Sequence, residues 1–173
     1  ALAKLLELMG LETGWIFMVD PDAQGPQDGS GFVLAAHHNL PLALDPAGYA
    51  AWGSRCECQR QCESGLLSDA YNEVHCSRLA AAKGDLRGLA VHASAPLRSG
   101  NRTLGILNVA GPDWASFSPR ALALLSSVAG QMGIALERAR LYDLLHERRI
   151  NEQAALLSLS NQLLSRLDLD EVI

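Results

Sequence analysis

The four cysteines of this chain lie within one short segment, and this grouping constrains the fold more than any other feature of the sequence. They are Cys56, Cys58, Cys62 and Cys76, in the spacing C-x-C-x3-C-x13-C. A chain of n residues spans at most roughly 3.3–3.6 Å × n, and turns or helices shorten that span, so the four sulfurs cannot lie far apart. The segment therefore holds a metal, forms disulfides, or carries a cluster of free thiols.

The length and composition predict one domain of ordinary size with an extension, since the chain has 173 residues of which 49% are apolar. The formal net charge is −5 and Lys and Arg form no long run, which argues against a nucleic-acid-binding surface. No stretch reaches the ~20 apolar residues that a membrane-spanning helix needs. We therefore expect neither nucleic acid nor a membrane span.

The chain starts on an amphipathic helical pattern that lacks the features of a signal peptide, and it has no initial methionine. We expect a piece of a longer cytoplasmic protein. Because the cytoplasm keeps thiols reduced, that setting favours metal or redox chemistry over structural disulfides.

The pattern of apolar residues predicts helices at both ends of the chain and strands between them. Residues 1–9 have helical spacing, and Phe117-Ser118-Pro119 is typical of a helix start, with Ser118 as the N-cap. A short helix is expected within 42–53, and weak helical character around Glu73 and Val74. Strands are expected at 15–19, 31–38, 89–97 and 103–110. This order favours an α+β fold, an antiparallel sheet covered by helices on one side.

The helix that begins at Ser118 has no breaker before the end of the chain. Its later apolar residues follow a roughly heptad spacing, which predicts a two-helix coiled coil of modest strength. These residues are Ile150, Ala154, Leu157, Leu164 and Leu167. The alternative is a helix that packs along its own domain.

Three motifs resemble the GAF domain, a small-molecule sensing module of bacterial signalling proteins. They are the strand Thr103–Val109, the segment Trp114–Ser118 and the helix Leu122–Leu141. The resemblance implies a GAF sensory domain over 1–141, with an antiparallel sheet covered by the N- and C-terminal helices. Residues 142–173 then form a signalling helix, because 159–172 resemble the linker into a further GAF domain or a kinase output module. The whole protein would be a histidine kinase, and this part of it would not be an enzyme.

The cysteine segment resembles a narrower subset of GAF sensor kinases, in which four cysteines bind an iron–sulfur cluster that senses oxygen or redox state. This resemblance implies Cys56, Cys58, Cys62 and Cys76 as cluster ligands, with Cys62 the least regular in spacing. The residues themselves leave other readings open. Four thiolates equally suit tetrahedral zinc, a thiol–disulfide switch needs no metal, and buried thiols can lack any role. Arg55, Arg60 and Arg78 could offset thiolate charge, and His75 could replace a ligand.

Two further functions remain open at this point. One is a small-molecule-binding GAF domain with structural zinc or a thiol switch; the other is a sulfoxide reductase of GAF fold, whose cysteine pattern this chain does not match. Among the other polar residues, we expect His37 and His38 to be a surface pair and His92 to be half-buried with its hydrogen bonds satisfied. Trp15, Trp52 and Trp114 are expected in the core or at its rim. A homodimer through the terminal helices is expected, with an output domain in cis.

Overall fold

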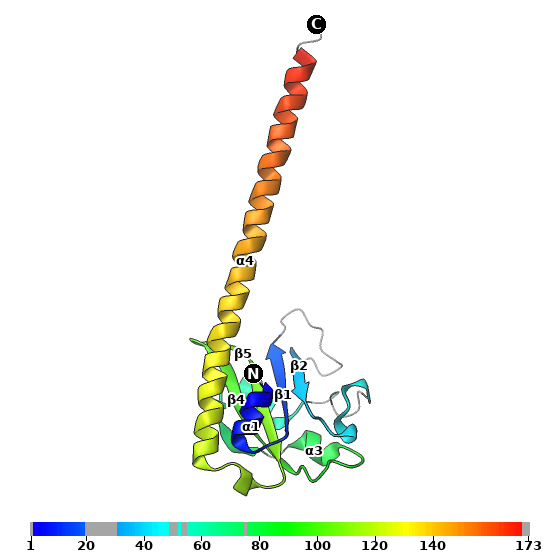
Figure 1. Ribbon diagram of the computed structural model, residues 1–173, viewed down its shortest axis with the longest axis vertical. Coiled ribbons are helices and arrows are strands. Elements are labelled where there is room, and N and C mark those ends of the chain that lie inside the picture. Colours follow the sequence, from blue (N-terminus) through cyan, green and yellow to red (C-terminus); the bar gives the residue numbers. More distant parts are fainter. Residues whose placement is uncertain (1, 20–30, 49–51, 53–54, 75, 171–173) are drawn as a thin grey trace. The chain divides into compact units, whose positions relative to one another are not determined.

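A five-stranded antiparallel sheet forms the centre of the fold, with the strand order β2-β1-β5-β4-β3 (Figure 1). The structure is a computed structural model that describes residues 2–19, 31–48, 52, 55–74 and 76–170. It divides into two units, Ala1–Ile134 and Ala135–Ile173. The sheet belongs to the first unit, and its strands are β1 (Thr13–Val19), β2 (Phe32–His38), β3 (Tyr71–Val74), β4 (Val91–Ser99) and β5 (Arg102–Gly111).

Helical segments precede, interrupt and follow the strands. The α-helices are α1 (Leu2–Met9), α2 (Glu57–Glu63), α3 (Ser77–Ala81) and α4 (Pro119–Asp170), and the short 3-10 helices are η1 (Leu42–Leu44), η2 (Pro46–Gly48) and η3 (Trp114–Ser116). The predicted antiparallel α+β fold with helices at both ends is therefore confirmed. No helix among the described residues combines the length and the apolar character needed to cross a membrane.

One face of the sheet carries an aromatic core. Trp15 pairs with Asn108 and Phe17 with Ile106 across β1 and β5, and residues opposite each other in a ladder share a face. The same face packs against the segment between β2 and β4, because Cys62 of α2 and Leu67 lie in one buried cluster with Trp15, Phe17 and Ile106.

The opposite face carries α1. A Cβ atom added to Gly14 of β1 would lie 3.2 Å from a methyl carbon of Leu2 and 3.3 Å from one of Leu6, both in α1. The sheet is thus covered on both faces, and the prediction of helices on one side is wrong. That prediction counted the helices at the chain ends and gave no packing role to the segment with the cysteines.

One local prediction for the middle of the chain is also wrong. Residues 71–74 form β3 and not a helical turn, because Tyr71 and Val74 pair with Ser94 and His92 of β4. Tertiary pairing has overridden a weak local preference. The short helix expected within 42–53 is present among the described residues as two 3-10 helices, η1 and η2.

The start of α4 follows the prediction closely. The Ser118 hydroxyl accepts a hydrogen bond from the amide of Ala121 at 3.2 Å, and Pro119 is the first helical residue. Gly133 lets α4 approach β4, since a Cβ there would lie 2.5 Å from the backbone nitrogen of Arg98. The prediction of a domain boundary at residue 141 stays a prediction.

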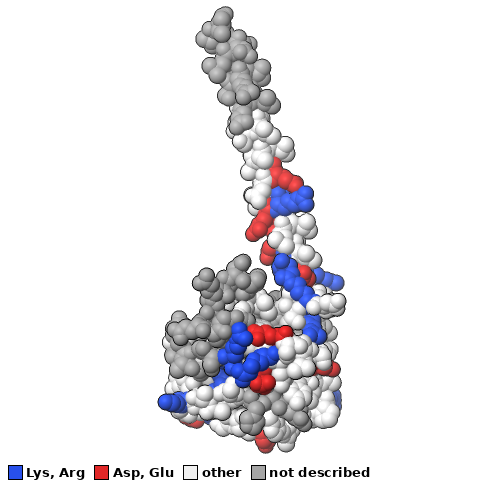
Figure 2. Space-filling model, turned by 180° about the vertical axis from the view of Figure 1, so that it is seen from behind, with Lys and Arg blue, Asp and Glu red and all other residues white. Residues whose placement is uncertain are grey.

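The second unit is the rest of α4, and it exposes large apolar side chains over much of its length. The most exposed of those described are Tyr142, Leu145, Leu156 and Leu157, each at least 63% accessible. Positively and negatively charged side chains are interspersed on the face shown in Figure 2. Ion pairs such as Arg148–Glu152, at 2.9 Å, connect successive turns of the helix. The predicted coiled coil stays a prediction.

Candidate metal-binding site

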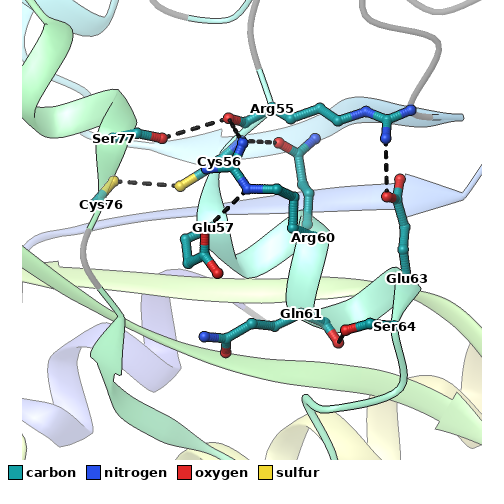
Figure 3. Close-up of polar contacts among 10 residues, drawn as sticks. Arg55, Cys56, Glu57, Arg60, Gln61, Glu63, Ser64, Cys76 and Ser77 are labelled. Carbon is teal, nitrogen blue, oxygen red and sulfur yellow. Dashed lines mark hydrogen bonds and ion pairs between the residues drawn. The ribbon is translucent and has the colours of Figure 1, made fainter.

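The sulfurs of Cys56 and Cys76 lie 3.6 Å apart, although 20 residues separate them in the chain. Each cysteine is the N-cap residue of a short helix, Cys56 of α2 and Cys76 of α3. Figure 3 shows the two side chains pointing toward each other from these two segments. Both are buried.

Gln59 fixes the position of Cys56. The backbone amide of Cys56 donates a hydrogen bond of 2.7 Å to the side-chain carbonyl of Gln59, which lies three residues later in α2. The guanidinium of Arg78 donates to the same oxygen at 3.1 Å. Gln59 and Arg78 are both buried, so one buried amide oxygen connects α2 and α3.

Strand pairing brings Cys76 to its place. Val74, the last residue of β3, pairs with His92 of β4, and Cys76 follows two residues later. Its sulfur then accepts a hydrogen bond of 3.3 Å from the amide of Leu79, which caps α3. The β3–β4 ladder therefore delivers the fourth cysteine of the sequence to His92.

His92 is fully buried, in contrast to the half-buried and satisfied histidine that the sequence predicted. Its ring lies 5.5 Å from the ring of Trp15, and neither ring nitrogen has a hydrogen-bond partner among the described residues. An unpaired buried polar group costs about 1–3 kcal/mol. Burial lowers the pKa of His92 to about 4, so the imidazole is neutral at pH 7 and keeps a lone pair for a ligand.

The ligand atoms of Cys56, Cys76 and His92 all lie within 4.8 Å of one another, so these three side chains could hold a metal ion. Two thiolates bound to one ion at 2.3 Å, in tetrahedral geometry, have sulfurs about 3.8 Å apart. The observed 3.6 Å between Cys56 and Cys76 fits that geometry closely. Sulfur and imidazole ligands together suit zinc, copper and iron.

Cys58 is a third thiol in the surroundings of this site, and its sulfur is not in the group of ligand atoms that lie within 4.8 Å of one another. It is fully buried on α2, in the same apolar cluster as Cys56, Cys76 and Leu44. Hydrogen bonds from the thiols of Cys58 and Cys76 hold the pKa of Cys56 below its usual range. The donated hydrogen bond and burial raise the pKa of Cys58. Metal binding at these cysteines requires thiolates, so it would release the protons that the thiols carry.

Cys62 lies in a different apolar environment. It is buried on α2 with Trp15, Phe17 and Leu67, and it is not in the described group of ligand atoms within mutual reach. Burial raises the pKa of its thiol to about 11. The four-cysteine ligand set therefore stays a prediction, with three members gathered and Cys62 packed in the aromatic core.

Of the arginines that the sequence placed near the sulfurs, only Arg78 is buried with them. Its guanidinium carbon lies 4.5 Å from the centroid of the Trp52 ring and 5.2 Å from that of Phe17. Arg55 and Arg60 instead form partly exposed ion pairs with Glu63 and Glu57, at 3.2 and 3.0 Å. His75, the predicted substitute ligand, lies outside the described residues.

A largely apolar hollow of about 310 Å³ reaches the site at Cys76. Its wall includes Leu79, Leu89, Val91 and the half-exposed Trp114. Cys76 is the most accessible of the three gathered thiols, at 7%, against 1% for Cys56 and 0% for Cys58. A small apolar molecule in the hollow would therefore meet the sulfur of Cys76 first.

Sequence reasoning gave His92 no role, although one signal was present. In the otherwise apolar strand β4, His92 and Ser94 alternate with alanines, and this period of two places both on one face. Ser94 pairs with Asn108 through a 2.7 Å hydrogen bond, whereas His92 has the sulfurs as neighbours. The other side chains agree with expectation: His37 and His38 are exposed, Trp15 is buried and Trp114 lies at the rim.

A model of the GAF domain family matches residues 1–137, and the chain therefore belongs to the GAF domain family. Over 145 residues it is 37% identical to the sensor histidine kinase YhcY of Bacillus subtilis (strain 168). That alignment takes in 81% of this chain and 36% of the relative, so the chain spans about a third of the kinase it matches.

Solved GAF structures share the fold at low sequence identity. The GAF domain of a phosphoenolpyruvate-protein phosphotransferase from Coxiella burnetii gives a TM-score of 0.58 at 15% identity, covering 83% of this chain and 82% of that one. The photoproduct state of GAF3 from Slr1393 of Synechocystis sp. PCC6803 gives 0.56 at 14% identity, covering 82% and 92%. At this identity the likeness concerns the fold alone.

Proposed function

We propose that this GAF domain is the redox- or oxygen-sensing part of a cytoplasmic signal-transduction protein and that it holds an iron–sulfur cluster through its cysteines. The observation that carries the proposal is the group of Cys56, Cys76 and His92, whose ligand atoms lie within 4.8 Å of one another in a buried site. Cys58 supplies a further thiol beside this group. The assignment of Cys62 as the fourth sulfur ligand is the part with the least structural support.

The surroundings of the sulfurs favour an anionic centre. Thiolates and the sulfides of a cluster are negatively charged, and a negative charge in an apolar site needs a nearby cation. Arg78 supplies one, buried beside the cysteines and linked to Cys56 through Gln59. Structural zinc is the alternative metal centre, and because four thiolates around Zn²⁺ also leave a net negative charge, Arg78 suits either metal.

Access to Cys76 favours a redox signal. The hollow beside this cysteine has mostly apolar walls, and dioxygen is a small apolar molecule that enters such a space readily. Dioxygen in this hollow would meet Cys76, which is the most exposed of the proposed cysteine ligands. A cluster held there would respond to oxygen while its other ligands stay covered.

A thiol–disulfide switch without metal is the second candidate, and the 3.6 Å between the Cys56 and Cys76 sulfurs favours it. A disulfide needs an S–S distance of about 2.05 Å, so a shift of ~1.5 Å would close the bond. Two electrons and two protons would pass to an oxidant such as a peroxide, which becomes water or an alcohol.

The relative supports a place in a two-component system, because a kinase of the same family contains a GAF domain of this kind. We infer an output domain in cis, a homodimer through the terminal helices, and no catalysis by residues 1–173 themselves. Signalling then requires two arrangements of the helices with different affinity for the two states of the centre. α4 is the element that would carry such a change, since it runs without a break from Pro119 to Asp170.

The test is an absorption spectrum, together with iron and acid-labile sulfide analysis, on protein purified without oxygen. The variants Cys58→Ser and Cys62→Ser are measured in parallel. Visible absorbance with matching iron and sulfide, lost in Cys58→Ser, would support the cluster. Loss in Cys62→Ser as well would support the four-cysteine ligand set. Colourless protein with stoichiometric zinc would make the site structural, and protein that binds no metal would leave the thiol switch or an organic ligand.

A further inference from the structure

We propose that His92 is a ligand of this metal centre, together with Cys56 and Cys76. This proposal rests on one part of the proposed function, namely that a metal centre is bound at this site. It places an imidazole beside the thiolates of Cys56 and Cys76, where the sequence implies sulfur ligands alone.

The first argument is geometric. The ligand atoms of His92, Cys56 and Cys76 lie within 4.8 Å of one another, and the two sulfurs are 3.6 Å apart. Ligands of one tetrahedral ion at 2.0–2.3 Å lie about 3.3–3.8 Å apart, so a shift of at most ~1.5 Å closes any pair in this group. Cys62 belongs to a different buried cluster, and its sulfur is not in this group.

The second argument concerns what else His92 could do. A buried histidine that serves only packing normally donates or accepts a hydrogen bond, because an unpaired polar atom is costly in an apolar site. Neither ring nitrogen of His92 has such a partner among the described residues. The ring of Trp15 lies 5.5 Å from the imidazole, measured between centroids, and the sulfurs of Cys56 and Cys76 lie within 4.8 Å of the ligand atom of His92.

The third argument is that the backbone already fixes this ligand set. His92, the second residue of β4, lies opposite Val74 at the end of β3 and opposite Ala110 of β5. Cys76 follows β3 by two residues, so strand pairing alone brings this sulfur to the imidazole. A mixed ligand set would also change the chemistry of a cluster, because a neutral imidazole in place of a thiolate raises the reduction potential.

The test is pulsed electron paramagnetic resonance of the reduced cluster in anaerobically purified protein that carries [15N]histidine. We expect a strong 15N coupling, absent in His92→Cys and retained in the control His38→Gln, whose side chain is exposed. His92→Cys should keep the cluster and lower its midpoint potential. A cluster with no histidine coupling, or with coupling unchanged in His92→Cys, would overturn the proposal while leaving the proposed sensor intact.

If the purified protein contains zinc, cobalt(II) replaces it and the ligand-field bands report the ligand set. The bands should shift toward those of an all-sulfur site in His92→Cys and stay unchanged in His38→Gln. Bands that do not respond to His92→Cys would overturn the assignment. Wild-type protein that takes up neither iron nor cobalt(II) would overturn both the metal centre and the role of His92.

Discussion

The imidazole of His92 is costly to bury without a ligand, because two polar nitrogens are removed from water with no described partner. Replacing such a group by an apolar side chain of similar size is nearly neutral or stabilising. We expect His92→Leu, stripped of metal with a chelator, to be 0 to about 2 kcal/mol more stable than wild type in urea unfolding. The same variant should lose metal binding.

His38→Leu is the matched control, since His38 is exposed and its replacement should change stability by less than about 0.5 kcal/mol. A loss of more than ~2 kcal/mol in chelator-treated His92→Leu would assign the histidine a structural role instead.

We expect Arg78 to act on the proposed centre through its charge. Its guanidinium lies over Trp52 and Phe17 and donates to Gln59, and it is the buried cation beside the cysteines. Arg78→Met keeps most of the side-chain length and removes the charge, so we expect metal affinity to fall about 10- to 100-fold. Competition with a chelator measures this. Arg60→Met, on an exposed pair with Glu57, should leave the affinity unchanged, and equal affinities in both variants would exclude the charge effect.

At the scale of elements, two glycines of α4 differ in the space available for a side chain. A Cβ on Gly133 would collide with the backbone of Arg98 in β4, whereas a Cβ on Gly130 meets nothing within 4 Å. Gly133→Ala should therefore destabilise the domain by about 1–3 kcal/mol, because backbone has to move. Gly130→Ala should stabilise it by about 0.5–1 kcal/mol through helix propensity. Thermal unfolding of both variants checks the two signs, and a stable Gly133→Ala would contradict the close contact of α4 with β4.

The elements with a strong local signal were predictable from sequence, and those that depend on distant pairing were not. Ser118 and Pro119 mark the start of α4 by their own chemistry, and the apolar run 103–110 forms β5 with an extra residue at each end. β3 has only four residues of mixed polarity, so its pairing with β4 decides its structure. The candidate site likewise has one part that was predictable from sequence and one part that was not. The cysteine spacing predicted a cluster of sulfurs, whereas His92 joins Cys76 only through the register of two strands.

At the scale of the whole molecule, the exposed apolar side chains of the second unit are the main feature to test. Leu157 is 66% accessible and lies at a predicted heptad seam with Ile150, which is 51% accessible. Leu157→Asp should shift the chain toward monomer in sedimentation velocity. Ser158→Asp adds the same charge one position away from the seam and should leave the mass unchanged. Wild-type protein that sediments as a monomer at all concentrations would exclude the dimer.

The aromatic rings around the site have an optical consequence. The rings of Trp15 and Trp52 are 5.9 Å apart, Arg78 lies over Trp52, and Trp15 contacts His92. Two of the three indoles in the chain thus lie beside the proposed centre. An iron–sulfur cluster absorbs where tryptophan emits, so its assembly should quench the intrinsic fluorescence strongly, whereas zinc should leave the emission largely intact. The protein therefore carries a built-in reporter, and its brightness during reconstitution or exposure to air can follow the state of the centre in real time.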